Sequence, residues 1–172
     1  MMKTLYLLRH AKSSWDNTGL TDHDRPLNER GFRAATVMGV YMAQSGIQPG
    51  LILCSSARRA LETLDQIRPR LAGRPTLCIE QELYGANASA LLKRFQAAEA
   101  GVGSILIIGH NPAMEDLAQR LIDKGDKQEI ARLTEKYPTG ALATLTLPVK
   151  SWEDAAFKTA TLCSFIVPKD LV

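Results

Sequence analysis

Three short apolar runs in this chain are each followed by a polar turn, and helical periodicity follows after two of those turns. The runs cover residues 5 to 8, 51 to 54 and 104 to 108. A run of four or five apolar residues fits a strand that is buried on both faces, which is typical of parallel sheets. Strands that alternate with helices predict an α/β fold, with a mostly parallel sheet covered on both faces.

Further segments complete this pattern. We expect strands at residues 4 to 9, 51 to 54, 76 to 79, 104 to 108, 142 to 147 and 159 to 167. We expect helices at residues 29 to 45, 57 to 72, 88 to 100 and 113 to 124. No clear helix separates the last two strands, so we expect one of them to join the sheet antiparallel. The charge-rich stretch from 124 to 138 is interpreted as a solvated connection.

Length and composition narrow the class of protein. A chain of 172 residues is long enough for one core, so we expect a single domain over residues 1 to 172. The 21 basic and 18 acidic residues give a net charge of +3 without a polybasic run, which does not indicate nucleic-acid binding. No apolar run is long enough for a signal peptide or a membrane span, so we expect a cytoplasmic protein that does not bind membranes.

The cysteines follow no disulfide or metal-binding pattern. Cys54, Cys78 and Cys163 all fall in expected strands and are interpreted as reduced core residues. No spacing typical of a metal site is present, and arginines beside histidines would repel a cation. We therefore expect neither a metal nor a cofactor.

Side chains with phosphate-binding chemistry follow three of the expected strands. Arg9 and His10 follow the first strand, Arg59 comes soon after the strand at 51 to 54, and His110 follows the strand at 104 to 108. Because the carboxyl ends of parallel strands lie at one edge of a sheet, we expect these four side chains to converge there.

Two arginines and two histidines suit phosphoryl transfer. The planar guanidinium forks of Arg9 and Arg59 would bind phosphoryl oxygens bidentately. An unprotonated imidazole nitrogen can attack phosphorus, and neighbouring cations disfavour the charged form of histidine. We predict His10 as the nucleophile and His110 as a hydrogen-bond donor to the phosphoryl oxygens. Helix starts capped by Ser56 and Asn111 would add backbone N–H groups to this anion site.

The long polar loop from residue 11 to 27 starts at the expected site, so we interpret it as the rim of a substrate cleft. Lys12, Trp15 and Arg25 are its candidate substrate contacts. Trp15 fits a rim hydrophobic residue equally well. His23, in an Asp-rich part of the loop, is interpreted as a solvated residue.

Three motifs in sequence order resemble a known family. Residues 7 to 11 read Leu-Leu-Arg-His-Ala, residues 55 to 63 read Ser-Ser-Ala-Arg-Arg-Ala-Leu-Glu-Thr, and residues 109 to 112 read Gly-His-Asn-Pro. Together they resemble the histidine phosphatase superfamily, also called phosphoglycerate mutase-like. Lys-Ser-Ser-Trp at 12 to 15 and the lack of a large inserted segment are similar to its small SixA-type phosphohistidine phosphatases.

The resemblance implies a three-layer α/β/α sandwich without a large cap domain. It implies a metal-independent phosphatase in which His10 becomes phosphorylated, while Arg9, Arg59 and His110 complete the phosphate pocket. Arg59 is preferred to its neighbour Arg58, because the family's Arg-Ala-x-x-Thr pattern begins at residue 59.

The sequence departs from the mutase-type members of this family. Ala11 and Asp16 stand where those members carry Gly and Asn, which argues against mutase activity. Glu82, just after the third expected strand, is the local candidate for the proton donor, with Glu80 close by; a surface charge is the alternative for either.

Three functions are compatible with these residues. A site without a dedicated acid favours phosphohistidine on signalling or carrier proteins, because an imidazole leaves more easily than an alkoxide. A phosphomonoesterase acting on a small phosphorylated metabolite is the alternative. The third is a phosphate-binding or partner-binding module without catalysis.

Overall fold

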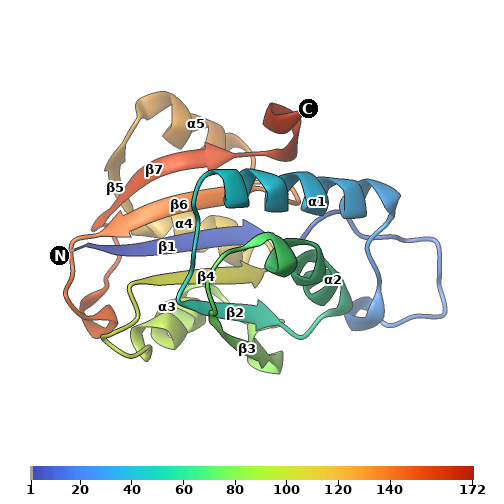
Figure 1. Ribbon diagram of the computed structural model, residues 1–172, viewed down its shortest axis with the longest axis horizontal. Helices are drawn as coiled ribbons and strands as arrows, with labels where there is room; N and C mark the ends of the chain where they lie inside the picture. Colours follow the sequence, from blue (N-terminus) through green and yellow to red (C-terminus); the bar gives the residue numbers. More distant parts are fainter. Residues whose placement is uncertain (1) are drawn as a thin grey trace.

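A seven-stranded sheet separates two layers of helices in the computed structural model, which describes residues 2–172 (Figure 1). The strands are β1 (Lys3–Arg9), β2 (Leu51–Ser55), β3 (Thr76–Glu80), β4 (Ser104–Gly109), β5 (Ile122–Gly125), β6 (Leu142–Leu147) and β7 (Ala160–Ile166). The helices are α1 (Glu29–Gln44), α2 (Arg58–Ile67), α3 (Ala88–Gln96), α4 (Ala113–Leu121) and α5 (Lys127–Glu135). Short 3₁₀ turns include η1 (Asp22–Asp24), η3 (Gln81–Leu83), η4 (Trp152–Asp154) and η5 (Pro168–Leu171).

The strand order is β3-β2-β4-β1-β6-β7-β5. Strands β3, β2, β4 and β1 are mutually parallel, whereas β6 pairs antiparallel with both β1 and β7. The mostly parallel sheet and the antiparallel entry of one late strand are therefore confirmed. The parallel half brings the carboxyl ends of β1, β2 and β4 to one edge.

Strand β1 lies inside the sheet and is buried on both faces, which explains its continuous apolar sequence. Leu5 and Leu7 pack in the core that includes α3, α4 and α5. Leu8 packs on the opposite face in the core that includes α1 and α2. These two cores make the three-layer α/β/α sandwich that the sequence predicts (Figure 1).

The helix expected at residues 113 to 124 is present but ends earlier, and the solvated connection expected at 124 to 138 was wrong. Helix α4 ends at Leu121, and the chain then forms edge strand β5 and helix α5 instead of a solvated connection. Strand β5 has the sequence Ile-Asp-Lys-Gly with only its first residue buried, so it shows no alternation of apolar residues. Leu133 is the one buried residue of α5, which leaves its helical periodicity weak.

Of the three cysteines that were expected in the core, one is fully buried. Cys54 is buried in β2, Cys78 is half-buried, and Cys163 is exposed on β7, so its assignment to the core is corrected. The burial pattern of β7 alternates more than an apolar run suggests, because this strand lies near the edge of the sheet. Within residues 2–172, no helix has both the length and the apolar character needed to cross a membrane.

Gly31, near the start of α1, offers a test of how tightly this helix packs against the loop that follows His10. A Cβ atom at this position would lie 2.0 Å from the carbonyl oxygen of Lys12. We expect Gly31→Ala to lower the free energy of unfolding by about 1–3 kcal/mol, because the backbone must move apart. Urea unfolding followed by circular dichroism measures this change.

Gly101→Ala is the matched control, since a Cβ atom there meets nothing within 4 Å. Because alanine is a better helix former than glycine by about 1 kcal/mol, Gly31→Ala would stabilise the protein if nothing clashed. A variant at least as stable as the wild type would contradict the expected loss.

Candidate active site

A pocket of about 280 Å³ lies at the carboxyl edge of the parallel strands. The four side chains that the sequence places at this edge all line it: Arg9, His10, Arg59 and His110. The rim candidates Lys12, Trp15 and Arg25 line it as well, together with Ser13, Asn111 and Thr139. The structure thus brings together side chains from the ends of β1 and β4, from α2 and from the loop after β1.

Backbone hydrogen bonds hold the end of β1 from both sides. The amide N–H of His10 donates to the carbonyl of Gly109 at 3.0 Å, and that of Arg9 donates to Ala141 at 3.1 Å. The N–H of Gly140 donates to the carbonyls of both Arg9 and His10, each at 3.0 Å. His10 therefore has little backbone freedom.

The imidazole of His10 is fixed in one tautomer. Its Nδ1 lies 2.7 Å from the carbonyl oxygen of Ala11, which can only accept a hydrogen bond, so Nδ1 carries the proton. The lone pair therefore resides on Nε2, to which the Nε–H of Arg59 donates at 3.3 Å. An unprotonated nitrogen is what attack on phosphorus requires.

Burial keeps His10 neutral. The pKa of His10 is lowered to about 3, mainly by desolvation; the hydrogen bond to Ala11 opposes this shift, and nearby His110, Arg59 and Arg9 add to it. The pKa of His110 is lowered to about 4, again mainly by burial and then by Arg59. The two rings are close neighbours, with centroids 5.1 Å apart.

Ser55, the last residue of β2, contacts His110. Its Oγ lies 2.8 Å from Nε2 of His110 and accepts the N–H of Ala57 at 3.2 Å. The Ser55 hydroxyl has one O–H and two lone pairs, so it can also donate to Nε2, and this arrangement would leave the proton of His110 on Nδ1. The Nδ1 of His110 and the Nε of Arg9 are buried without a hydrogen-bond partner among residues 2–172. Buried polar atoms normally have partners, so these two nitrogens suit an acceptor supplied by a ligand.

Asp22 neutralises Arg59. The guanidinium of Arg59 donates to the Asp22 carbonyl at 2.7 Å and to its carboxylate at 3.0 Å. The pKa of Asp22 is lowered to about 2, first by the hydrogen bond from the Tyr84 hydroxyl and also by Arg59 and Arg25. The carboxylate is therefore ionised at neutral pH and cannot donate a proton.

Arg25 organises the rim. Its guanidinium carbon lies 3.4 Å from the ring centroid of Trp15, and its Nη1 donates to Ser13 Oγ at 3.0 Å. Arg25 is buried, whereas 72% of Trp15 is exposed, so the indole covers the arginine and presents its other face to solvent.

Known proteins resemble this chain over nearly its full length. An uncharacterized protein of Mycobacterium tuberculosis is 33% identical over 164 residues, which cover 94% of this chain and all of that protein. A structure described as a candidate phosphohistidine phosphatase SixA from Agrobacterium tumefaciens is 32% identical, with a TM-score of 0.79 over 96% of this chain and 99% of that chain. Its counterpart from Nakamurella multipartitia is 26% identical, with a TM-score of 0.82 over 98% and 97%.

The family model of the histidine phosphatase superfamily (branch 1) matches residues 5–84. The chain belongs to the histidine phosphatase superfamily. It lies in the SixA-type branch and is a histidine-type phosphatase. The matched residues include Arg9, His10 and Arg59, while His110 lies beyond them and joins the pocket through β4.

The Arg-Ala-x-x-Thr pattern of this histidine phosphatase has a structural reason. Thr63 Oγ1 accepts the N–H of Ala11 at 3.0 Å and donates to the carbonyl of Arg59 at 2.7 Å. The threonine thus ties the residue after His10 to the helical turn of Arg59. Arg58 is exposed, pairs with Glu62 at 3.3 Å and does not line the pocket, in agreement with the preference for Arg59.

Glu82 does not reach this pocket. It is exposed in η3 and is not among the pocket-lining residues, so we leave it out of the proposed catalytic group. Glu80 is bound by Arg94 at 2.7 Å. The turn at η3 instead brings Tyr84 to the site, where its ring lies 5.4 Å from that of His110.

Ser55, Asp22 and Tyr84 were not among the site residues predicted from the sequence. Ser55 opens the second motif at the end of a buried strand, and this position is the signal that points to it. Asp22 and Tyr84 come from a loop and a turn without periodicity, and only their three-dimensional placement joins them to Arg59.

Two helix starts and one histidine also differ from expectation. The N-cap residues are Ala57 and Pro112, each one residue after the expected caps Ser56 and Asn111. Helix α2 begins one residue later than expected, whereas α4 begins at Ala113 as expected. Ser56 bonds to His23 at 2.9 Å instead of capping α2, which makes His23 half-buried. Asn111 accepts a backbone N–H within α4 through its side chain.

The depressed pKa values predict that both pocket histidines of this phosphatase stay neutral from about pH 8 down to about pH 5, whereas a free histidine titrates near 6.5. Nitrogen-15 NMR of the imidazoles should show His10 as the Nδ1–H tautomer throughout this range. The urea-unfolded protein is the control and should titrate normally. A folded-state midpoint near pH 6.5 for His10 would contradict the burial argument.

Proposed function

We propose that this phosphatase hydrolyses phosphohistidine on proteins through a phosphorylated His10. The observation that supports this most directly is the absence of a protonatable carboxyl group among the residues that line the pocket, within the part of the chain that the structure describes. The carboxylate of Asp22, which binds Arg59, has a pKa of about 2 and is held by cations.

The phosphoryl group would lie between Arg9, Arg59 and His110. Charge-assisted hydrogen bonds from the two guanidinium groups bind the equatorial oxygens and stabilise the charge of the transition state. The unpartnered Nδ1 of His110 and Nε of Arg9 supply further donors. Donors that are fixed before the substrate arrives need little reorganisation during the reaction.

Reaction proceeds in two displacements. In the first, the lone pair of His10 Nε2 forms a bond to phosphorus, and the bond from phosphorus to the nitrogen of the substrate imidazole breaks. That imidazole leaves with the electron pair and is neutral when its other ring nitrogen carries a proton. In the second, water attacks the phosphoryl group on His10, releases inorganic phosphate and returns the lone pair to Nε2.

The leaving group decides between the two substrate classes. An alkoxide from a phosphate ester needs a proton from a nearby acid, whereas phosphohistidine has a second ring nitrogen that binds a proton from solvent. A pocket lined by three arginines, a lysine and neutral histidines lacks such an acid and therefore suits phosphohistidine.

A phosphoenzyme trap tests the proposed function. The protein is mixed with phosphoramidate or with glycerol 2-phosphate, an ester with an alkoxide leaving group, then quenched and analysed intact by mass spectrometry. We expect one added phosphoryl group with phosphoramidate and much less with the ester. His10→Ala should abolish the adduct while its circular dichroism spectrum stays unchanged. Phosphorylation of the His10→Ala protein, or faster turnover of the ester, would reject the proposal.

Arg59→Lys tests bidentate phosphate binding. Lysine keeps the charge but loses the planar fork, so we expect kcat/KM for phosphoramidate to fall by about 10²-fold. Arg58→Lys is the matched control, because Arg58 is the exposed neighbour on the same helix, and it should keep wild-type activity. Equal activity of the two variants would show that Arg59 acts only through its charge.

A further inference from the structure

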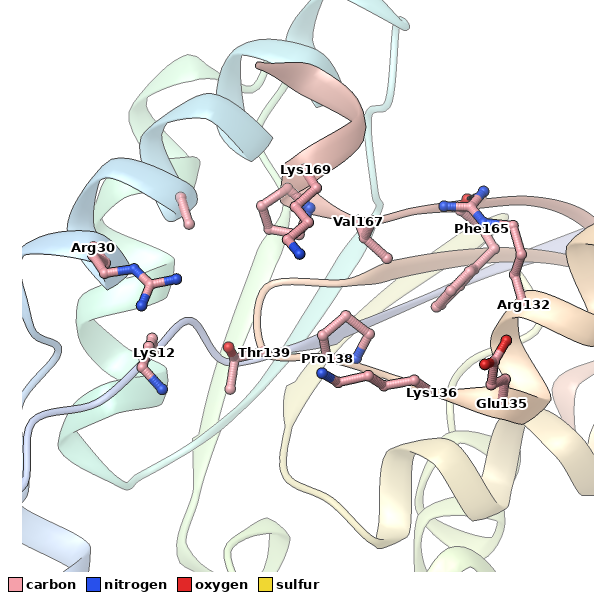
Figure 2. Close-up of a pocket in the computed structure, with 12 residues that line it drawn as sticks. Lys12, Arg30, Arg132, Glu135, Lys136, Pro138, Thr139, Phe165, Val167 and Lys169 are labelled. Carbon is pink, nitrogen blue, oxygen red and sulfur yellow. Dashed lines mark hydrogen bonds between the residues drawn. The ribbon is translucent and has the colours of Figure 1, made fainter.

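Figure 2 shows a second and larger cavity, of about 570 Å³. It adjoins the phosphate pocket, with which it shares two lining residues. Its lining comes from the loop after β1, helices α1 and α5, the segment before β6, strand β7 and turn η5. We call this cavity the groove. Its lining residues are Lys12, Arg30, Ala34, Arg132, Glu135, Lys136, Pro138, Thr139, Phe165, Val167, Pro168 and Lys169.

The groove continues into the phosphate pocket. Lys12 and Thr139 line both cavities, so a bound chain could pass from one to the other without leaving the surface of the protein. Nothing in the proposed reaction uses the rest of the groove.

Unneutralised cations surround the groove. Figure 2 shows the charged ends of Lys12, Arg30, Lys136 and Lys169 around Pro138 and Thr139. These four side chains make no ion pair or hydrogen bond within residues 2–172. The whole chain has a net charge of only +3, so positive charge is concentrated here.

Two other charged residues line the groove but do not add unpaired positive charge to it. Arg132 is already paired with Glu129 at 2.9 Å and Asp170 at 2.8 Å, and Glu135 is the single acidic residue of the lining. The unpaired cations therefore outnumber the acidic lining four to one.

The shape and chemistry fit a segment of polypeptide better than a small ligand. Small-ligand sites hold a few convergent polar groups inside an apolar cavity, but the four free cations here are all exposed. Between them the lining is apolar, with half-buried Pro138 and Val167 and buried Phe165. An acidic segment with interspersed apolar side chains would match both features.

We propose that the groove docks an acidic segment of the protein that carries the phosphohistidine. This inference rests on the proposed function, because it assigns the groove to the same substrate. Exposed cations attract such a segment at long range and raise the rate of productive encounter, an effect that salt screens. Docking there presents the neighbouring phosphohistidine to His10 through the shared residues Lys12 and Thr139.

Matched phosphohistidine peptides test this inference. One peptide carries four glutamates on each side of the phosphohistidine, separated from it by Gly-Ser spacers, and its counterpart carries glutamines instead. We expect kcat/KM to be about tenfold higher for the glutamate peptide at low salt, with the difference residing in KM and disappearing at high salt.

The triple variant Arg30→Gln, Lys136→Gln, Lys169→Gln should lose this preference while it hydrolyses the glutamine peptide at the wild-type rate. The matched control replaces three exposed cations outside both cavities, namely Arg74, Lys93 and Lys124, with glutamine and should keep the preference. Binding of the unphosphorylated glutamate peptide, followed by fluorescence anisotropy, should weaken about tenfold in the groove variant only.

The outcomes separate the two proposals. If neither peptide is dephosphorylated, the proposed function fails, and the anisotropy measurement still reports on the groove. If both peptides react equally fast at low salt and bind both variants alike, the docking inference alone is overturned. The docking inference would also be overturned if inorganic tripolyphosphate inhibited saturably while the glutamates had no effect. The groove would then bind a small polyanion and not a polypeptide.

Discussion

The hydrogen bonds at the end of β1 fix the position of His10, and the other contacts of the site depend on them. Because β1 lies between β4 and β6, the backbone of His10 is held by Gly109 on one side and Gly140 on the other. With the backbone fixed, the carbonyl of Ala11 lies within reach of Nδ1 and assigns the proton to that nitrogen. The nucleophilic lone pair of Nε2 thus follows from sheet topology and not from a neighbouring base.

The charged residues of the site have different electrostatic roles. A protonated histidine would be unfavourable in a buried position beside two guanidinium groups, so burial and cations act in the same direction on His10. The cations are compensated elsewhere, since Asp22 binds Arg59 from the rim, where half of its side chain is exposed. Placing the carboxylate on the loop instead of in the pocket keeps Arg59 oriented without adding a negative charge next to the phosphoryl group.

Sequence patterns predicted the strands and helices with regular apolar spacing and missed the elements without it. Runs of apolar residues identified β1, β2 and β4 within a residue or two, and the side chains that follow them converge as expected because parallel strands end at one edge. Strand β5 and helix α5 went unrecognised, because an edge strand with three exposed residues and a helix with one buried residue have almost no periodicity. Asp22 and Tyr84 join the site through loop geometry, which no local pattern encodes.

The segment before β6 links catalysis to the proposed recognition of the substrate. Pro138 and Thr139 line the groove, while Gly140 and Ala141, directly after them, donate to and accept from the backbone at Arg9 and His10. Gly140 has a φ of +79°, a backbone conformation that favours glycine. A Cβ atom at this position would lie 2.8 Å from Cγ of Pro168, which also lines the groove. One short segment therefore forms a wall of the groove and a support of the nucleophile. A partner seated in the groove would contact Pro138 and Thr139, directly before the backbone of Gly140 and Ala141 that positions Arg9 and His10.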